Sequence, residues 1–372
     1  MPAESPNQDG VYLDWNATTP PHPQVLEAML AAAQTAWGNP ASTHATGRRA
    51  RLEVEELREA LGAALGAHPR DVVLTSGGTE ANNLRLAHAP GIVTSRLEHP
   101  SVVRVAEALE VQGRPVCWVS VPASGCLDPS AVANACQGMP PGTWVAVQAA
   151  NHETGVIQPL VAIAEAVHAA GLLLHVDAVQ AFGKLQLSEL AGADSIAVTA
   201  HKIRGPKGIG ALAFRKSAPK PLLLGGSQER GLRPGTVDAV AAAGFRAALA
   251  LVESGPRRWA ELAVLRDELE LALDNVSVGN GAGPRLPHVS NRSFPGWRGD
   301  ELVAALDLLG VRVSSGSACA AGTAEPSPVI TTMLGRERAT SAIRFSLGDE
   351  TRREDLERAK AALFRVLDSP GR

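Results

Sequence analysis

Cysteine is scarce in this sequence. Four occur among 372 residues, at positions 117, 126, 136 and 319. No two of them form a CxxC pair, and four thiols in a chain of this length do not make the disulfide framework of a small secreted domain. Cys117 and Cys136 lie in apolar or helical contexts and are interpreted as packing residues, whereas Cys126 lies in a turn and receives no role.

Aromatic residues are also few, at 3% of the chain, so alanine, valine and leucine must fill most of the core. The net charge is only −3 and no basic stripe is present, which argues against nucleic acid as a direct ligand. No apolar run is long enough to span a bilayer, so no membrane association is expected. The first ten residues lack the basic and apolar regions of a signal peptide, and we therefore expect a cytoplasmic protein.

Short apolar segments alternate with helical ones over the first part of the chain. The strand candidates are residues 72–75, 91–95, 116–121, 144–149, 172–176, 195–199 and 210–214. Helical segments, among them residues 48–66, 129–136 and 160–170, separate several of them. This alternation predicts a mainly parallel α/β sheet that binds its ligands at the carboxyl ends of the strands.

The pattern changes near residue 255, where an amphipathic helix is predicted for residues 259–273. A shorter α/β set follows, with segments at residues 289–294, 300–309, 311–314 and 341–347 and a helix from about residue 353. A chain of this length suggests about two domains. We predict a large domain formed by residues 23–256 and a smaller domain formed by residues 1–22 and 257–372.

Two charged residues follow apolar strands. Asp177 comes after the run from Leu172 to Leu174, and Lys202 comes after the run from Ser195 to Val198 and before a Gly/Pro-rich turn. Pyridoxal phosphate needs such a pair, because a lysine forms the Schiff base and a carboxylate keeps the pyridine nitrogen protonated. The alternative is that both are surface charges.

Two further segments suit a phosphate-bearing cofactor. The turn Ser76-Gly77-Gly78-Thr79 precedes a helix, so its backbone N–H groups could bind a phosphate at the positive helix end, although such a turn can also be only a turn. Glu98-His99 follows a strand candidate. His99 could lie flat over a cofactor ring and shuttle protons, or it could be a partly buried loop residue.

Near the end of the chain, Arg344 lies between Ile343 and Phe345 in an apparent strand. A buried arginine must pair with an anion, and its planar fork suits a substrate carboxylate or a structural salt bridge. Cys319 lies in a run of small polar residues from Ser314 to Thr323, which is typical of a loop that carries a reactive thiol. The alternative is an inert small residue in a tight turn.

Together these motifs resemble the cysteine desulfurases, which belong to the class-V aminotransferase family and to the fold-type I pyridoxal-phosphate enzymes. The resemblance extends from residues 12–20 to residues 343–348 and includes residues 38–42, 229–236 and 325–327. The segment from Ser314 to Cys319 is similar to that of the long-loop group, which includes the nitrogen-fixation and iron–sulfur-assembly enzymes. The implied fold has a large domain with a mainly parallel seven-stranded sheet and a smaller C-terminal α/β domain.

The resemblance implies a role for each residue that matches the family pattern. Lys202 would carry the cofactor as an aldimine and act as the base at the substrate Cα. Asp177 would pair with the pyridinium nitrogen, Gln180 would bond the ring hydroxyl, and His99 would stack on the ring and help to move protons. The phosphate would be held by Gly78, Thr79, Thr199 and His201, and by Thr236 of a second subunit, which implies a homodimer.

The resemblance also implies that Asn16 and Arg344 bind the substrate and that Cys319 attacks its sulfur. L-cysteine and an acceptor thiol would give L-alanine and a persulfide, for iron–sulfur cluster assembly or thio-modification by an unidentified acceptor protein. No metal is expected, although Cys319 could transiently ligate a cluster. The alternatives are selenocysteine cleavage, another class-V reaction such as transamination, or a non-catalytic sulfur-transfer scaffold, against which Lys202 and Asp177 argue.

Two departures from the family pattern stand out. In Asn151-His152-Glu153 a histidine occupies a position where the family usually has a second asparagine that reaches the cofactor hydroxyl. His152 could still bond there, and its charge could alter the cofactor's electronics. The sequence also lacks the C-terminal extension with which long-loop housekeeping members dock a scaffold protein, which puts that partner in doubt.

Overall fold

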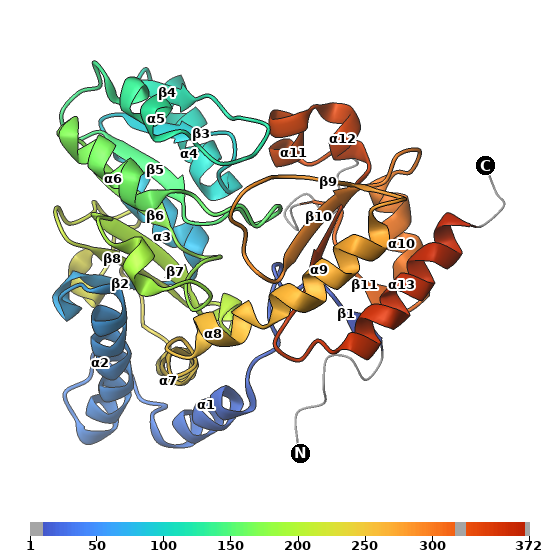
Figure 1. The fold of residues 1–372 in the computed structure, drawn as a ribbon. Coiled ribbons are helices and arrows are strands. Elements are labelled where there is room, and N and C mark those ends of the chain that lie inside the picture. Colours follow the sequence, from blue (N-terminus) through green and yellow to red (C-terminus); the bar gives the residue numbers. More distant parts are fainter. Residues whose placement is uncertain (1–9, 317–324, 369–372) are drawn as a thin grey trace.

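The computed structural model describes residues 10–316 and 325–368. A seven-stranded sheet forms the larger part, with the strand order β2-β8-β7-β6-β5-β3-β4 (Figure 1). Its strands are β2 (Val72–Thr75), β3 (Ile92–Ser95), β4 (Val116–Val119), β5 (Trp144–Gln148), β6 (Leu173–Asp177), β7 (Ser195–Thr199) and β8 (Gly210–Phe214). Strand β8 runs antiparallel to β2 and β7, whereas β3, β4, β5, β6 and β7 pair in parallel. The predicted mainly parallel sheet is therefore confirmed.

The parallel strands end at one edge of this sheet, which is where polar side chains gather. Strand β6 ends at Asp177, and β7 ends at Thr199, from which a 3₁₀ turn leads to Lys202. Strand β2 leads through Gly77 into the next helix. Each of these polar residues comes directly after a run of buried apolar residues that forms a strand of the sheet. It therefore lies at the carboxyl end of that strand.

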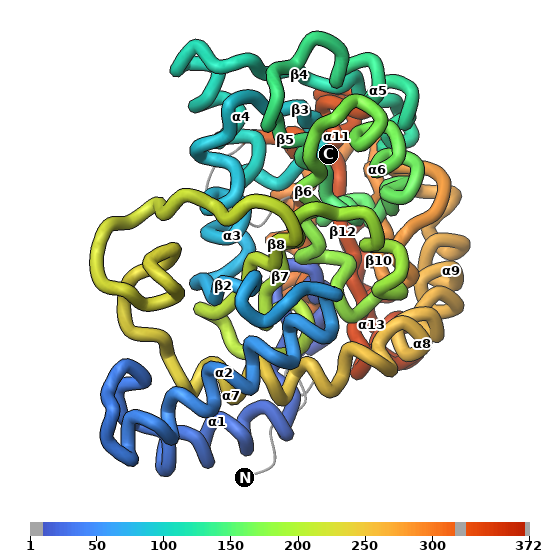
Figure 2. The backbone as a smooth tube through the Cα atoms, turned by 90° about the vertical axis from the view of Figure 1, so that its left-hand side faces the viewer, coloured from blue at the N-terminus to red at the C-terminus, as the bar shows by residue number. Residues whose placement is uncertain are grey.

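Helices cover the sheet. They are α1 (Pro23–Thr35), α2 (Ala45–Leu65), α3 (Gly78–Leu86), α4 (Pro100–Val111), α5 (Pro129–Cys136), α6 (Leu160–Ala169) and α7 (Ala239–Leu249). In Figure 2, α1, α2 and α7 lie together, and α7 contacts both of the others. On α2 the buried residues Val54, Leu57, Leu61 and Leu65 recur at helical spacing, so one face of the helix packs into the main core.

Val329, Ile330, Met333 and Ala339 still pack into the main core, but most of the remaining elements build a second core. They are β1 (Val11–Tyr12), α8 (Gly255–Ala260), α9 (Leu262–Leu273), β9 (Val278–Gly279), β10 (Val289–Ser293), α10 (Gly299–Leu308), β11 (Val311–Arg312), α11 (Pro328–Leu334), α12 (Arg336–Thr340), β12 (Ala342–Ser346) and α13 (Arg353–Leu367). Strands β12, β10 and β9 form an antiparallel sheet, and β1 pairs in parallel with β11. The helix predicted for residues 259–273 is in fact two helices, α8 and α9, which are interrupted at Glu261.

This second core draws its residues from both ends of the chain. Leu13 and Trp15 pack with Trp259 and Phe345 in one buried cluster, on the right-hand side of Figure 1. Packing is tight: a Cβ added at Gly348 would lie 1.8 Å from the indole ring of Trp15. The cluster lies within residues 1–22 and 257–372, but the main core also takes in Val289, Ile330 and Ala342, so the division into residues 23–256 and residues 1–22 with 257–372 stays a prediction. Within residues 10–316 and 325–368, no helix combines the length and apolar character required to cross a bilayer.

Candidate active site

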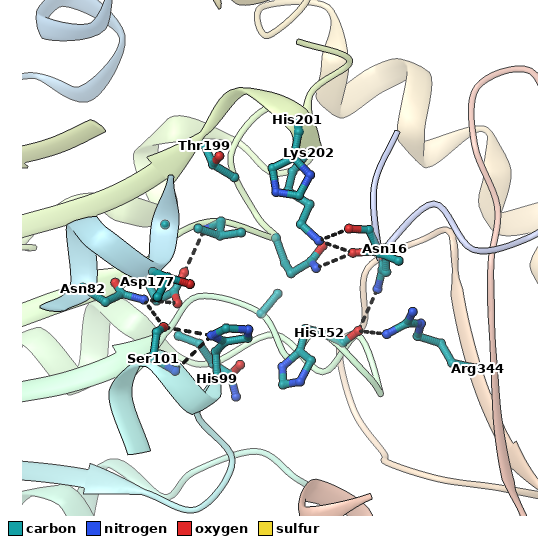
Figure 3. Close-up of a pocket in the computed structure, with 17 residues that line it drawn as sticks. Asn16, Asn82, His99, Ser101, His152, Asp177, Thr199, His201, Lys202 and Arg344 are labelled. Atoms are coloured by element: carbon teal, nitrogen blue, oxygen red, sulfur yellow. Dashed lines mark hydrogen bonds between the residues drawn. The ribbon is translucent and has the colours of Figure 1, made fainter. Parts of the chain in front are cut away.

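A cavity of about 240 Å³ opens at the carboxyl edge of the seven-stranded sheet. Eleven of the predicted site residues line it: Asn16, Gly78, Thr79, His99, His152, Asp177, Gln180, Thr199, His201, Lys202 and Arg344. Figure 3 shows that they come from opposite sides, with Asp177 and His99 on one side and Asn16 and Arg344 on the other. Segments that are far apart in the sequence therefore meet at one site.

Asp177 is buried and accepts two N–H groups. Oδ2 accepts from Nδ2 of Asn82 at 2.7 Å, and Oδ1 accepts from the backbone N–H of Val179 at 3.0 Å. Burial raises the pKa of Asp177, and these two hydrogen bonds oppose that shift. The carboxylate is thus held in a fixed orientation at the cavity wall.

His99 caps helix α4. Its Nδ1 accepts from the backbone N–H of Ser101 at 3.1 Å and lies 2.8 Å from the Ser101 hydroxyl. Burial, with the nearby charges of His152 and Lys202, lowers the pKa of His99 to about 3. The ring is therefore uncharged at neutral pH, and it meets the His152 ring edge to face at 5.5 Å between centroids.

The amine of Lys202 reaches the cavity from the turn after β7. Its Nζ donates to the carbonyl oxygens of Asn16 and Ala17, the latter at 2.8 Å. Gln180 also donates to the Asn16 carbonyl, at 3.0 Å, and its own Oε1 accepts from Lys184 at 3.3 Å. Lys184 is fully buried, and burial together with Lys202 lowers its pKa to about 7.

The opposite end of the cavity can hold an anion. Helix α3 begins at Gly78 without a side-chain cap, so the N–H groups of its first turn are available. A Cβ added at Gly78 would lie 2.5 Å from Cγ2 of Val179, so glycine permits the close approach of the backbone here. Thr199 and His201 line the same end, and burial lowers the pKa of His201 to about 3.

Arg344 lies on the other side of the cavity and is almost completely buried. Its Nη2 pairs with Asp14 at 2.5 Å, and its Nη1 donates to the carbonyl oxygens of His152 and Gly316 at 3.1 and 3.3 Å. Within the described residues its Nε has no hydrogen-bond partner. Arg344 thus forms a structural salt bridge with Asp14, and its Nε can still donate to a further anion.

His152 lies between Arg344 and His99. Neither ring nitrogen has a hydrogen-bond partner among the described residues, and Nε2 lies 3.5 Å from Oε1 of Glu153, which is too long for a good hydrogen bond. The His152 carbonyl accepts from the Asn16 side chain at 3.0 Å. The other side-chain atom of Asn16, Oδ1, bonds Nε2 of His288 at 2.8 Å.

Two predicted residues are not in this cavity. Thr236 is exposed and lines a separate groove with Arg51 and Arg58. Cys319 lies outside the described residues. Among residues 10–316 and 325–368, no group of His, Cys, Asp and Glu side chains has a geometry that could hold a metal ion.

Sequence reasoning missed several residues that the structure brings to the site. Asn82 and Ser101 line the cavity and contact Asp177 and His99, yet the sequence analysis gave them no role. For Ser101 a signal existed, because His99-Pro100-Ser101 is a typical helix start in which the third residue's N–H meets the cap. Asn82 is inside a helix, and only the tertiary structure turns it toward Asp177.

Pyridoxal phosphate fits these residues. Lys202 offers an amine, Asp177 offers a buried carboxylate acceptor and His99 offers an uncharged ring, all at one cavity. The glycine cradle at Gly78 and the start of α3 offer backbone N–H groups for a phosphate. When bound, this cofactor acts as an electron sink for carbanion chemistry on amino acids.

Comparisons with known proteins agree with this geometry. The profile of the class-V aminotransferase family matches residues 11–359. A Mycobacterium tuberculosis protein named IscS-like cysteine desulfurase is 37% identical over 373 residues, which cover 95% of each chain. A solved NifS-like protein superposes with a TM-score of 0.87 at 32% identity and covers 96% of this chain and 99% of its own. The structure of SspA in complex with cysteine has a TM-score of 0.77 at 30% identity, covering 91% of this chain and 98% of its own.

Proposed function

Because this chain belongs to the class-V aminotransferase family and is a pyridoxal-phosphate-dependent cysteine desulfurase, we propose that it converts L-cysteine into L-alanine and carries the sulfur as a persulfide on Cys319. The observation that carries this proposal is the meeting of Lys202, Asp177, His99 and Arg344 at one cavity. A structural relative, SspA, has been solved in complex with cysteine, which supports the choice of substrate.

Lys202 is the amine that binds the cofactor and the base that removes the Cα proton of the substrate. Its two carbonyl acceptors, Asn16 and Ala17, hold the amine at the cavity wall until it is used. Asp177 would hold the ring nitrogen of the cofactor and stabilise its proton, because the carboxylate is already oriented by Asn82 and Val179. His99 would pack on the ring as an uncharged side chain.

Arg344 binds the substrate carboxylate through its Nε edge, which has no partner in the described part of the chain. Asp14 keeps the guanidinium in place from the other side. Asn16 contributes to the same pocket. The further assignments, in which Gln180 and His152 contact the ring hydroxyl and Gly78, Thr79, Thr199 and His201 hold the phosphate, follow the lining of the cavity.

Cys319 supplies the thiolate that attacks the substrate Sγ. The new bond joins the two sulfur atoms while the Sγ–Cβ bond breaks, and its electron pair stays on the substrate carbon until Cβ is protonated to give L-alanine. An acceptor thiol then removes the outer sulfur from the persulfide. We propose that this acceptor is a protein of iron–sulfur assembly or of a thio-modification system. We also propose that the enzyme acts in the cytoplasm, where the free thiols of Cys117, Cys126 and Cys136 stay reduced.

A homodimer completes the site in this proposal. Thr236 lies outside its own cavity and is exposed, so it can reach the phosphate end of a second copy. Large apolar side chains are exposed nearby in sequence, with Leu224 93% and Leu223 60% exposed, and Trp37 is 72% exposed. We propose that a second subunit covers them.

The reaction is tested by feeding the purified holoenzyme L-cysteine with and without dithiothreitol and measuring sulfide and alanine. We expect equal amounts of both products with the reductant, and loss of both in Lys202→Ala. Cys319→Ala should abolish sulfide release from L-cysteine, whereas selenocysteine cleavage that survives in Cys319→Ala would favour the lyase alternative. Absence of products and of the yellow bound cofactor in the wild type would favour the non-catalytic scaffold.

The dimer is tested with mixed subunits. A Thr236→Ala homodimer should bind the cofactor weakly at both sites. A heterodimer of Lys202→Ala with Thr236→Ala should keep one complete site, because the Lys202→Ala subunit supplies Thr236 to the partner's intact lysine. If neither site of this heterodimer bound the cofactor as tightly as the wild type does, the proposal that Thr236 acts at the partner's site would be wrong.

A further inference from the structure

A chain of hydrogen bonds links the two cavity groups that face the proposed cofactor, Asp177 and His99 (Figure 3). The Asn82 amide lies at its centre. Nδ2 of Asn82 donates to Asp177 Oδ2 at 2.7 Å and to Ser101 Oγ at 2.9 Å, and Ser101 Oγ lies 2.8 Å from His99 Nδ1. Asn82, Ser101 and Asp177 are at most 6% exposed, so each finds its partners in the protein rather than in water.

His175 fixes the orientation of the Asn82 amide. Its Oδ1 lies 2.9 Å from Nε2 of His175, and Nδ1 of His175 lies 2.8 Å from the hydroxyl of Ser195. An amide oxygen only accepts, so Nε2 of His175 must carry a proton and Nδ1 must accept from Ser195. An ionised Asp177 also only accepts, which requires the amide nitrogen of Asn82 to face it.

The remaining hydrogen bonds are assigned from their donors, of which the backbone N–H of Ser101 is the one that cannot be reversed. Both N–H groups of Asn82 are used, one on Asp177 and one on Ser101. The Ser101 hydroxyl accepts from Asn82, so its own hydrogen is available for Nδ1 of His99. The backbone N–H of Ser101 points to the same nitrogen at 3.1 Å.

Two donors therefore converge on Nδ1 of His99. We infer that Asn82 and His175 are positioning residues that, through Ser101, fix His99 as the tautomer with its proton on Nε2. A proton on Nδ1 would face both the hydroxyl hydrogen and the N–H of Ser101. The buried site also disfavours a charged ring, in agreement with the low pKa of His99.

This inference deepens the proposed function and rests on it for its catalytic consequence alone. In the fixed tautomer His99 donates a hydrogen bond from Nε2 and cannot take up a proton there. Removal of the substrate proton then falls to Lys202, and His99 acts by holding the ring and by donating to a group that gains negative charge.

The tautomer is read directly by NMR. We would label the histidines of the holoenzyme with ¹⁵N, record long-range ¹H–¹⁵N spectra and identify His99 by its loss in His99→Gln. We expect the Nε2–H pattern and no change from about pH 5.5 to 7.5, the range around the usual histidine pKa of about 6.5. A wild-type His99 with its proton on Nδ1, or a charged ring in this range, would overturn the inference.

Variants show whether the hydrogen bonds of Asn82 and His175, or only the helix cap at Ser101, determine the tautomer of His99. Asn82→Ala frees the Ser101 hydroxyl to turn and accept, so the ratio of tautomers should shift toward Nδ1–H by about fivefold, the size of a typical net hydrogen bond. His175→Phe removes the donor to Asn82 and should shift it in the same direction. His175→Gln keeps an amide donor and should restore the wild-type spectrum.

Asn83→Ala is the matched control, because Asn83 donates to the backbone oxygens of Thr79 and Ser101 and contacts neither Asp177 nor His99. Circular dichroism shows whether each variant is folded, and the variants at Asn82 and His175 interrupt the same chain at two successive positions. If folded Asn82→Ala and His175→Phe proteins kept the wild-type tautomer of His99, the helix cap alone would determine that tautomer. This result would overturn the positioning role of Asn82 and His175. Failure of the proposed reaction would appear in the sulfide assay and leave these spectra unchanged.

Discussion

The two sides of the cavity differ in how completely their polar atoms are paired. On the side of the seven-stranded sheet, Asn82, Ser101 and Asp177 use every polar side-chain atom in hydrogen bonds. Toward Arg344, both ring nitrogens of His152, which follows β5, and Nε of Arg344 on β12 have no hydrogen-bond partner among the described residues. Buried polar atoms are rarely left unpaired without a reason.

This difference agrees with our proposal, in which the cofactor stays bound on the first side and the substrate enters and leaves on the second. A cofactor that stays bound needs groups that are oriented before it arrives, and hydrogen bonds such as those of Asp177 provide this. A substrate that enters and leaves needs donors that are not already paired, such as Arg344 Nε. Glu98 is an exception on the sheet side: its carboxyl oxygens have no hydrogen-bond partner among the described residues, and burial and then Asp177 raise its pKa well above the usual range.

The largest effect is expected on the paired side. Asp177→Asn removes the negative charge that stabilises a protonated cofactor ring while keeping the size of the side chain. We expect the kcat for alanine formation to fall by at least about 10³-fold, the upper range for the loss of one preorganised electrostatic group. The assay is alanine release at saturating L-cysteine, and a loss of less than tenfold would show that Asp177 is not the ring partner.

A smaller effect is expected on the unpaired side. Arg344→Lys keeps the charge but loses the fork, so the substrate carboxylate loses a charge-assisted hydrogen bond worth about 1.5–3 kcal/mol. We expect kcat/KM for L-cysteine to fall about 10- to 150-fold, mainly through KM. Arg292→Lys is the control, because Arg292 pairs with Asp274 and Ser277 away from the cavity. Equal losses in both variants would argue for a structural role of Arg344.

The paired side should also make the fold sensitive to acid. Burial is the main cause that lowers the pKa of His99, His175 and His201 to about 3. The unfolded chain binds these protons below about pH 6.5, whereas the folded chain resists them, so stability is complete above pH 6.5 and decreases as pH falls toward 3. The free energy of unfolding should decrease by up to about 4 kcal/mol per pH unit within this window.

Denaturant unfolding of the holoenzyme at several pH values measures this slope. His175→Gln removes one of the three groups and should reduce the slope by about 1.4 kcal/mol per pH unit. A slope that is the same in His175→Gln and in the wild type would mean that His175 does not contribute.

The smallest effect is expected from His152→Asn, which restores the residue that the family usually has. The ring nitrogens of His152 make no hydrogen bond within the described residues, so the fold should tolerate the change. We expect the pH dependence of the visible absorbance of the bound cofactor to move by less than about one pH unit, equivalent to about 1.4 kcal/mol. A titration identical to the wild type would remove the hypothesis that this histidine tunes the cofactor.

On the paired side, the residues that directly follow a strand were predictable from the sequence. Asp177 and Lys202 each end an apolar run, and parallel strands bring such ends together, so the cavity followed from local pattern alone. Asn82 was not predictable, because its position inside α3 gives no sign of which buried carboxylate it meets. The antiparallel direction of β8 was also beyond the pattern, since apolar strands look alike in either direction.

The unpaired side was predictable in its residues but not in its partners. Arg344 stands out as a charge in a strand, yet its ion pair with Asp14 joins residues 330 positions apart. Asn16 was expected to bind substrate, and the bonds of its side chain to His152 and His288 depend on tertiary contacts that no local spacing encodes. Such contacts are fixed only when both cores are assembled.

The contact between the segment that follows β1 and strand β12 sets an order of events during synthesis. The backbone N–H of Asn16 bonds the hydroxyl of Ser346, so the early segment waits for 330 further residues to leave the ribosome. At about 5–20 residues per second this wait lasts about 15–65 s. Until then Asp14 lacks its ion pair with Arg344, so the nascent chain can fold its large sheet before the Arg344 side of the cavity is complete.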